Sequence, residues 1–443
     1  MKTPIADFVR DYQNAGIARL HMPGHKGVGF LGCEALDITE VQGADSLYHA
    51  QGVIAQSEES AAALFGAGRT LYSTEGSSQC IRAMLYLAVV NRPAGSAPMI
   101  VAARNVHKSF VHAAALVDFE TVWLWPESDT HTLCGCPISA ETVEKTLRRL
   151  PAPPAAVYVT CPDYLGGMTD VAAIAEVCHR HGTCLLVDNA HGAYLRFLQP
   201  SRHPLDLGAD MCCDSAHKTL PVLTGGAYLH ISKDAPGEFA RQAKDAMALF
   251  GSTSPSYLTM ISLDLCNRYL EEEYSRRLLR TAEKIEAARQ ALHWAGWQTE
   301  DTDPLRLTIL VPEGMTGEDL AQKLRENGAE CEYADPDFLV LMLTPENDPQ
   351  DIDCVVQALG KNQAGAKQRQ LPLAKAEQVC SVRQALFAPH ETVAAKDALG
   401  RICGAPTVGC PPAIPIAVSG ERIGEEALEL FRYYDVEFVD VLK

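Results

Sequence analysis

Short apolar runs that alternate with helical patterns are the feature that most constrains the fold of this chain. Between the second and third of these runs, "TDVAAIAEVCHRHG" (169–182) keeps its apolar residues at helical spacing and ends at a glycine. Strand, helix and strand in this rhythm predict a parallel α/β sheet within residues 51–270. Four runs read as strands buried on both faces: "PMIVAA" (98–103), "AAVYVT" (155–160), "CLLVD" (184–188) and "ADMCCD" (209–214).

The rest of the chain predicts further parts. Residues 271–296 have the spacing of one long amphipathic helix, and residues 303–360 alternate apolar runs with helical patterns, as a compact α+β unit does. Upstream, "SEESAAALFGAG" (57–68) predicts a helix that Ser57 caps and Gly66 ends. We therefore expect four parts: an N-terminal arm (1–50), a large domain (51–270), a linking helix with a small α+β domain (271–362) and a C-terminal domain (363–443).

Charge and composition argue against several classes of function. The 443 residues carry a formal net charge of −18, whereas a nucleic-acid surface needs clustered Lys and Arg. No apolar run approaches the length of a membrane helix, and the first residues hold no apolar signal segment. The 15 cysteines are scattered without a CxxC pair. We expect a cytoplasmic protein with reduced thiols, no metal site, and neither nucleic acid nor membrane as a partner.

A candidate anion site lies where a helical pattern begins near Ser77. Gly76, Ser77 and Ser78 precede the apolar face of "QCIRAMLYLAV". Backbone N–H groups and two hydroxyls would then stand at a helix N-terminus, where the helix dipole favours an anion. Plain N-capping by serine explains the same pattern and is the commoner use of this residue type.

Two predicted strands end in residues that could contact a ligand, since ligands of open α/β sheets bind beyond the carboxyl ends of strands. Asp188 ends one strand and could pair with a cationic nitrogen, and His191 follows three residues later. Capping of the next segment is the alternative for Asp188. His107 follows another strand and could stack on a flat ring, whereas its neighbour Lys108 reads as a solvated turn residue.

Lys218, in "CCDSAHKTLP" (212–221), stands among small and apolar residues directly after a predicted strand. Desolvation there would make its amine a nucleophile toward an aldehyde. Ser215 and His217 could bind an anion beside it. A phosphate cup, a stacking imidazole, an anion for a pyridinium nitrogen and a reactive lysine, in this chain order, are the parts that a pyridoxal 5′-phosphate site needs.

These residues make the sequence similar to the bacterial ornithine/lysine/arginine decarboxylases of the fold-type I class. The resemblance implies an α/β fold: an aspartate-aminotransferase-like large domain with a mostly parallel seven-stranded sheet, and smaller α+β C-terminal domains. It extends over nearly the whole chain, through the segments "HMPGHKG", "DITEVQGADSL", "FGAGRTLYSTEGSSQCIRAM", "ARNVHKS", "DNAHGAY", "LGADMCCDSAHKTLPVLTGGAYLH", "STSPSYLTMISLD" and "GCPPAIPI" with "SGERI".

The resemblance also implies roles for the site residues. Lys218 would bind the cofactor covalently, Asp188 would pair with the pyridine nitrogen, and His107 would stack on the ring. His191 would lie near the phenol oxygen of the cofactor and the substrate carboxylate. The phosphate would be surrounded by Gly76, Ser77, Ser78, Ser215 and His217, with Ser252 or Thr253 reaching the phosphate of the neighbouring subunit of a homodimer.

The implied reaction is loss of CO2 from a basic L-amino acid in polyamine metabolism. Arginine is favoured over lysine and ornithine because the chain resembles the short form of the family. Lys218 or His217 would return a proton to Cα. Glu421, in "SGERI", could supply the anionic end of the substrate pocket, and a solvated turn residue is the equal alternative.

The sequence departs from the family pattern at a few positions. Asn189 stands where Glu is common, Pro221 and Gly225 alter the usual "HKTLGALTQ", and Ala413 and Ser419 replace a common Gly and Pro. None of these departures removes a group that the chemistry needs.

Two other functions stay open on the sequence. One is an aminotransferase or a lyase of the same fold, since the same cofactor parts serve all of them. For an aminotransferase, Arg306 and Arg401 are the candidates that would bind a substrate carboxylate. The other is a catalytically quiet paralogue with a binding or regulatory role.

Overall fold

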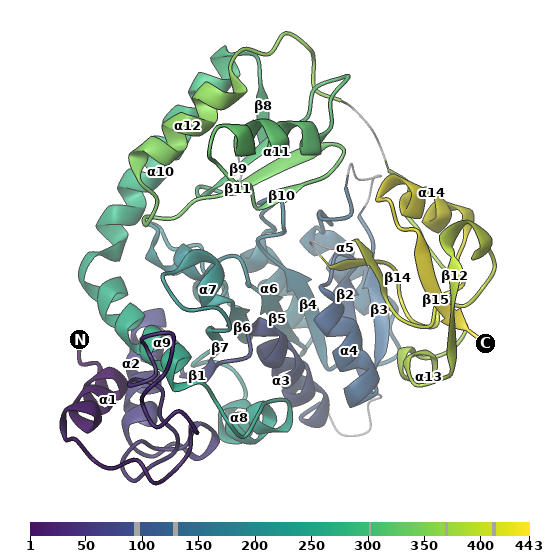
Figure 1. The fold of residues 1–443 in the computed structure, drawn as a ribbon. Coiled ribbons are helices and arrows are strands. Elements are labelled where there is room, and N and C mark those ends of the chain that lie inside the picture. Colours follow the sequence, from purple (N-terminus) through teal and green to yellow (C-terminus); the bar gives the residue numbers. More distant parts are fainter. Residues whose placement is uncertain (93–97, 127–131, 301–302, 368–370, 410–412) are drawn as a thin grey trace. The chain divides into compact units, whose positions relative to one another are not determined.

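The computed structural model describes residues 1–92, 98–126, 132–300, 303–367, 371–409 and 413–443 (Figure 1). The chain divides into two compact units, each made of two separate stretches. The first unit comprises Met1–Arg92 with Cys184–Arg276, and the second comprises Pro93–Thr183 with Arg277–Lys443. The largest sheet of the structure has seven strands, which confirms the predicted α/β class.

The strands of the first unit are buried along almost their whole length, as strands covered on both faces are. β5 and β6 run parallel, whereas β7 runs antiparallel to both β6 and β1. Both strands predicted here are confirmed, β5 with the same bounds and β6 two residues shorter at its start. In sheet order the four strands are β1 (Arg69–Ser73), β7 (Ala227–Ile231), β6 (Met211–Asp214) and β5 (Cys184–Asp188).

One of the predicted helix boundaries in this unit is wrong. The helix α2 begins at Val53, so Ser57 lies inside it, where its buried hydroxyl is 2.6 Å from the Tyr72 hydroxyl. Gly66 ends α2 as predicted, with a left-handed φ of 72° that glycine adopts without strain. The α-helices of this unit are α1 (Pro4–Asn14), α2 (Val53–Phe65), α3 (Ser77–Val90), α7 (Ala216–Thr219), α8 (Gly237–Leu249) and α9 (Tyr257–Tyr269), and the short 3-10 turns are η1 (Leu47–His49), η2 (Ala193–Phe197) and η3 (Pro204–Leu207).

The second unit contributes three parallel strands in the order β4, β2, β3. Two of them confirm predicted strands, each beginning one residue later than expected. Asp170 caps α6 by accepting the Ala173 N–H, and Gly182 follows the helix with a φ of 66°. The elements are β2 (Met99–Ala103), α4 (Lys108–Val117), β3 (Glu120–Leu124), α5 (Ala140–Arg149), β4 (Ala156–Thr160) and α6 (Val171–Arg180).

The predicted long helix is confirmed from Ser275 onward. A π-helical turn, η4 (Leu270–Tyr274), joins α9 directly to α10 (Ser275–Trp294), which buries Leu278, Ile285 and Leu292 on one stripe. The α+β part that follows has a four-stranded sheet in the order β10, β11, β9, β8. Its elements are β8 (Gln298–Glu300), β9 (Arg306–Leu310), α11 (Gly317–Glu326), β10 (Tyr333–Ala334), β11 (Phe338–Met342) and α12 (Pro349–Leu359).

The C-terminal part builds its own small core, in which Cys403, Phe431 and Val441 are fully buried. Two two-stranded sheets pair β12 with β15 and β13 with β14. Within the residues that the structure describes, no helix has both the length and the apolar character that a membrane span requires. The elements are α13 (Val382–Leu386), β12 (His390–Ala394), η5 (Ala395–Asp397), β13 (Thr407–Gly409), β14 (Ile414–Ala417), α14 (Glu425–Tyr433) and β15 (Phe438–Leu442).

Asp163 lies in a tight turn after β4. Its Oδ1 accepts hydrogen bonds from the N–H groups of Leu165 (3.0 Å) and Gly167 (2.7 Å). Burial raises the pKa of the Asp163 carboxyl from 3.8 to about 6, although the Gly167 N–H and the charge of Arg306 act in the opposite direction. The ionised carboxylate is therefore a net cost to folding at neutral pH.

We expect Asp163→Asn to stabilise the protein at neutral pH. The folded-state pKa lies above the ordinary value, so the stability that this carboxyl contributes is complete below about pH 4 and is lost as the pH rises through about 6. An amide keeps an accepting oxygen and does not ionise. The difference in unfolding free energy between variant and wild type should grow from pH 4 to pH 7.5 by roughly 2 kcal/mol, allowing for partial exposure. Denaturant unfolding at both pH values measures it, and equal differences would contradict the prediction.

Candidate active site

Three of the predicted site residues lie at or just beyond the carboxyl ends of β5 and β6: Asp188, His191 and Lys218. Asp188 ends β5 and lies opposite Cys213 of β6 in the parallel ladder, and the Asn189 N–H donates to the Cys213 carbonyl at 3.0 Å. Asp188 is almost fully buried, and its Oδ1 accepts the Ala190 N–H at 3.2 Å. This edge is where open α/β sheets bind ligands.

Lys218 lies in the short helix α7, four residues beyond the end of β6. Its Nζ is 2.9 Å from Nε2 of His191, which is buried. An ammonium can only donate a hydrogen bond, so His191 accepts at Nε2 and carries its ring proton on Nδ1. The structure thus places Lys218, the predicted covalent lysine, in contact with His191, which lies three residues after Asp188 in the chain.

Ser215 and His217 flank this lysine. Nδ1 of His217 is 3.1 Å from the Gly226 carbonyl, which can only accept, so Nδ1 carries the proton. Ser215 Oγ lies 3.5 Å from the same nitrogen. Burial lowers the pKa of His217, and the charge of Lys218 lowers it further, while the bond to Gly226 raises it in part. His217 is therefore neutral at pH 7.

The helix α3 begins where the sequence predicted an anion site. Gly76 is its N-cap, with a φ of 74°, and no side chain caps the helix, so the reading of Ser77 as a plain N-cap is wrong. A Cβ added at Gly76 would meet no atom within 4 Å. The side of Gly76 on which a Cβ would stand is therefore open, and a helix start without a side-chain cap is a position that can bind an anion.

The loop of Ser252 and Thr253 lies beside this helix start. The Ser252 N–H donates to the carboxylate of Glu75, and both Ser252 and Thr253 are exposed. Their predicted contact with the phosphate of a neighbouring subunit stays a prediction.

Gly225, one of the departures from the family pattern, has a structural reason. It has a φ of 94°, and a Cβ there would lie 2.6 Å from the Thr74 carbonyl oxygen. The Gly225 carbonyl also accepts the Gly76 N–H at 2.7 Å. Glycine is therefore required where the loop after Lys218 meets the start of α3.

His107 belongs to the second unit, where it caps α4. Its Nδ1 accepts the Ser109 N–H at 3.2 Å and lies 2.9 Å from the Ser109 hydroxyl. These contacts fix the ring orientation and leave the proton of the neutral imidazole on Nε2. Half-buried and held in this way, the ring has the form that stacking on a cofactor would need.

The alternative that Glu421 is a solvated turn residue is wrong, because its side chain is only 1% exposed. Its Oε2 accepts the Val418 N–H at 2.7 Å and lies 3.4 Å from an Arg104 nitrogen. Burial raises the pKa of Glu421, and the charge of Arg104 opposes this. The predicted contact of Glu421 with substrate stays a prediction.

The two arginines considered for an aminotransferase both have protein partners. Arg306 is buried at the start of β9 and donates to the Asp163 carbonyl. Arg401 donates to the Leu442 carbonyl at 2.7 Å and pairs with Glu391.

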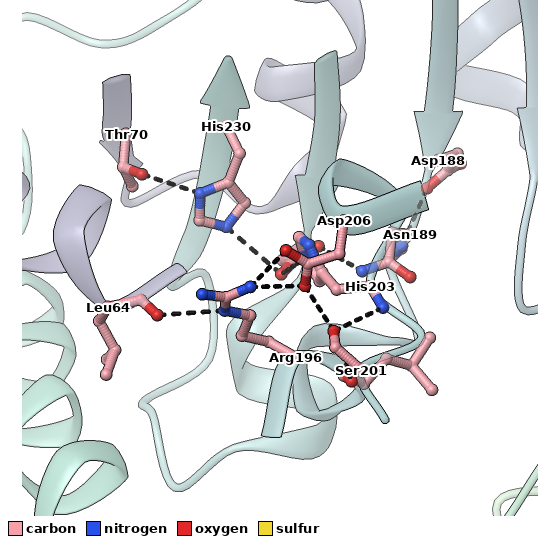
Figure 2. Close-up of polar contacts among 12 residues, drawn as sticks. Leu64, Thr70, Asp188, Asn189, Arg196, Ser201, His203, Asp206 and His230 are labelled. Atoms are coloured by element: carbon pink, nitrogen blue, oxygen red, sulfur yellow. Dashed lines mark hydrogen bonds and ion pairs between the residues drawn. The ribbon is translucent and has the colours of Figure 1, made fainter. Parts of the chain in front are cut away.

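The structure adds a group of residues that the sequence did not single out. Behind Asn189, the Asp214 carboxylate at the end of β6 is flanked by His203 and His230 (Figure 2). The two histidines are 27 residues apart and follow no local motif, so only the fold brings them together. Asp214 stands in the stretch that contains Lys218 but gives no signal of its own.

Comparisons with known proteins show the family to which the chain belongs. The family model "Orn/Lys/Arg decarboxylase, major domain" matches residues 3–300. An arginine decarboxylase of Halalkalibacterium halodurans is 29% identical, over 97% of this chain and 93% of the relative, and an arginine decarboxylase of Bacillus subtilis is 28% identical, over 98% and 94%.

Solved structures show the same fold. The constitutive lysine decarboxylase of E. coli superposes with a TM-score of 0.79 at 18% identity, covering all of this chain and 82% of the other. A serine palmitoyltransferase of Sphingomonas wittichii covers 80% of this chain and 82% of its own, with a TM-score of 0.58 at 16% identity. Because the family model covers well over half of the sequence, the chain belongs to the Orn/Lys/Arg decarboxylase family.

Proposed function

We propose that this protein decarboxylates a basic L-amino acid, with arginine preferred, and that it uses pyridoxal 5′-phosphate. The observation that carries the proposal is the contact of Lys218 Nζ with His191 at 2.9 Å, beside Asp188 at the carboxyl edge of the sheet. Membership of the family supplies the reaction type. The expected products are CO2 and the corresponding amine.

The residues of the first unit fit this cofactor. Lys218 would hold its aldehyde carbon, and Asp188 would face its ring nitrogen. The uncapped start of α3, with Gly76, Ser77 and Ser78, suits the phosphate, because N–H groups and the helix dipole favour a dianion there. When bound, the cofactor would supply the electron sink that decarboxylation needs.

The side chains of the protein then have distinct tasks. The ionised Asp188 would keep a proton on the ring nitrogen, since a nearby anion favours a protonated base. His191 holds the proton of Lys218 by accepting at Nε2. His217 is neutral at pH 7, and its Nδ1 proton is donated to the Gly226 carbonyl. We therefore assign to Lys218 the task of returning a proton to Cα of the substrate. His107 would cover one face of the ring.

The preference for arginine rests on the relatives. One relative from Halalkalibacterium halodurans and one from Bacillus subtilis, each matching almost the whole chain, are named arginine decarboxylases. A Pseudomonas aeruginosa lysine decarboxylase matches only 58% of the chain, at 24% identity. Glu421 remains the proposed partner of the charged substrate end, and substrate would then compete with Arg104 for its carboxylate.

A homodimer is part of the proposal. The N-terminal arm exposes large apolar side chains, which a second copy of the chain could bury. Mass photometry should show twice the 48.0 kDa of one chain, and a monomer that turns over substrate would contradict the shared site. The exposed apolar side chains of the arm are Ile17, Leu20, Met22, Val28, Phe30 and Leu31.

We also place the enzyme in the cytoplasm. Every cysteine among the residues that the structure describes is a free thiol. Free thiols in this number suit a reducing compartment. Fractionation of the source cells would test this, and recovery outside the cytoplasm would contradict it.

In the substrate test, pyridoxal phosphate is added to the purified protein. Arginine, lysine and ornithine are then supplied in turn as substrates. We expect CO2 release with arginine at a kcat/KM at least about tenfold above that with lysine, since the two side chains differ in length and in hydrogen-bond geometry. Identification of the amine product distinguishes decarboxylation from amino transfer, which would give an oxo acid. A visible cofactor band without turnover of any of the three would refute the proposed reaction.

A further inference from the structure

A buried cluster of polar side chains lies directly behind the proposed cofactor site. The carboxylate of Asp214 is fully buried at the end of β6. Its Oδ2 lies 3.1 Å from His203 Nε2 and 3.3 Å from His230 Nε2, and its Oδ1 accepts the Asn189 side-chain N–H at 2.6 Å. His203, His230 and Asn189, which Figure 2 labels, belong to three separate segments of the chain.

Both ring nitrogens of His230 lie close to polar groups. The Thr70 hydroxyl lies 2.9 Å from Nδ1, and the Asp214 carboxylate lies 3.3 Å from Nε2. Burial lowers the pKa of His230, so the ring is neutral. Burial alone would raise the pKa of Asp214, but the charge and hydrogen bonds of His203 and His230 outweigh it and hold this pKa well below its ordinary value. Asp214 is therefore ionised, with the Asn189 amide on one oxygen and the imidazole nitrogens of His203 and His230 near the other.

Further hydrogen bonds hold the loop that carries His203. The His203 N–H donates to Ser201 Oγ at 3.2 Å, and the Ser201 hydroxyl in turn donates to Asp206 at 2.5 Å. Asp206 also pairs with Arg196 (Figure 2). The loop that carries His203 is thus held by its own hydrogen bonds, and His203 in turn helps to fix the position of the Asp214 carboxylate.

Hydrogen bonding accounts for the cluster better than a metal ion does. The three ligand atoms lie within 4.8 Å of one another, a grouping found once among the residues that the structure describes. Structural zinc, however, takes four ligands, and here the group nearest to a fourth is the amide of Asn189, which presents an N–H. A dication with a single carboxylate would also leave a net positive charge in a dry interior.

The cluster is linked to two proposed site residues through one short segment. Asn189, which binds Asp214 through its side chain and Cys213 through its N–H, follows Asp188 directly and precedes His191 by two residues. A carboxylate at position 189 would repel Asp214, whereas the amide donates to it. Asn189 therefore binds the segment 188–191 to the neighbouring strand β6 through two hydrogen bonds.

We propose that Asp214, held by His203 and His230, is a positioning residue that fixes Asp188 and His191 through Asn189. The proposal rests on the proposed function. A well-placed Asp188 carboxylate favours the protonated form of a base on the cofactor, and the fixed segment keeps His191 on Lys218.

The test compares Asp214→Asn with Asp210→Asn. Asp210 is a matched control, because it is also buried, lies just before the other end of β6, and accepts the Leu185 N–H at 2.8 Å. Each variant, loaded with pyridoxal phosphate, is titrated with pH while its visible absorption is followed. In Asp214→Asn, the pH midpoint of the absorption change should lie about one unit below that of the wild type. In Asp210→Asn, this midpoint should stay within about 0.3 unit of the wild-type value.

Kinetics with the preferred substrate give a second readout. Asp214→Asn should lower kcat by about ten- to a hundredfold with KM within about threefold, because misplaced groups slow the reaction more than they weaken binding. If Asp214→Asn does not fold, His203→Gln is tested in its place. In that variant the pH midpoint of the absorption change should also fall, but by less. An unchanged midpoint in the variants that fold would overturn the inference.

The proposed function can fail separately. If the wild-type protein shows no cofactor band at all, the proposed function fails before the cluster is tested. Metal analysis of the purified wild type decides the remaining alternative. One equivalent of zinc that is lost in Asp214→Asn would replace the hydrogen-bonded cluster by a metal site and overturn the inference, whereas metal-free protein supports it.

Discussion

Lys218→Ala is expected to abolish both turnover and the visible band of bound pyridoxal phosphate. The substitution removes the amine that would bind the cofactor covalently and, in our assignment, the group that returns a proton to Cα. Loss of a positioned proton donor alone costs about 10²–10⁴-fold, so the total loss in kcat should exceed about a thousandfold. Steady-state CO2 release and an absorption spectrum of the reconstituted protein measure the two effects.

The matched control for this variant is Lys233→Ala. Lys233 is exposed in the turn after β7, in the same unit, and belongs to no part of the proposed site. It should keep the band and the rate of the wild type. Retention of the band in Lys218→Ala would show that another amine binds the cofactor, and the assignment of Lys218 would be wrong.

Asp188→Asn should bind the cofactor but lose about a hundredfold or more in kcat. The amide has almost the shape of the carboxylate and keeps an oxygen that can accept the Ala190 N–H. It carries no charge, so it would not keep the ring nitrogen protonated, and electron withdrawal from the substrate would weaken. Removal of one preorganised electrostatic group typically costs about 10²–10³-fold.

The control for this loss is Asp170→Asn. Asp170 is an exposed N-cap of α6, and asparagine is about as good a cap as aspartate, so neither stability nor rate should change much. Stopped-flow measurement of cofactor binding separates the two possibilities for Asp188. A large loss of cofactor affinity with normal kcat at saturation would show that Asp188 holds the cofactor rather than tunes it.

The sheet could be predicted from the sequence because its strands are short, apolar and regularly spaced. β5 was bounded without error, since "CLLVD" lies between a helix-ending glycine and an abrupt change to polar residues. The start of α2 could not be placed, because Ser57, a residue type that often caps helices, serves a buried hydrogen-bond network with Tyr72 instead. That network depends on a neighbouring strand, and local propensity carries no information about it.

The same limit applies to the site. Lys218, Asp188 and His191 could be predicted because each lies at or shortly after the end of a strand, a position that the chain order reveals. The partners of Asp214 were not found, because His203 and His230 belong to a loop and to a separate strand. Asn189 was noted only as a departure from a pattern. Its contact with Asp214 explains why an amide suits that position.

The division of each unit into two stretches has a consequence for synthesis of the chain. β1 (Arg69–Ser73) leaves the ribosome early, but its partner β7 (Ala227–Ile231) is translated more than 150 residues later. Until then, the first unit cannot close, and β1 presents an unpaired backbone edge to other nascent chains. Such delayed pairing slows folding and exposes the chain to aggregation. Expression of this protein should therefore depend on translation rate and on chaperones that cover the early strand.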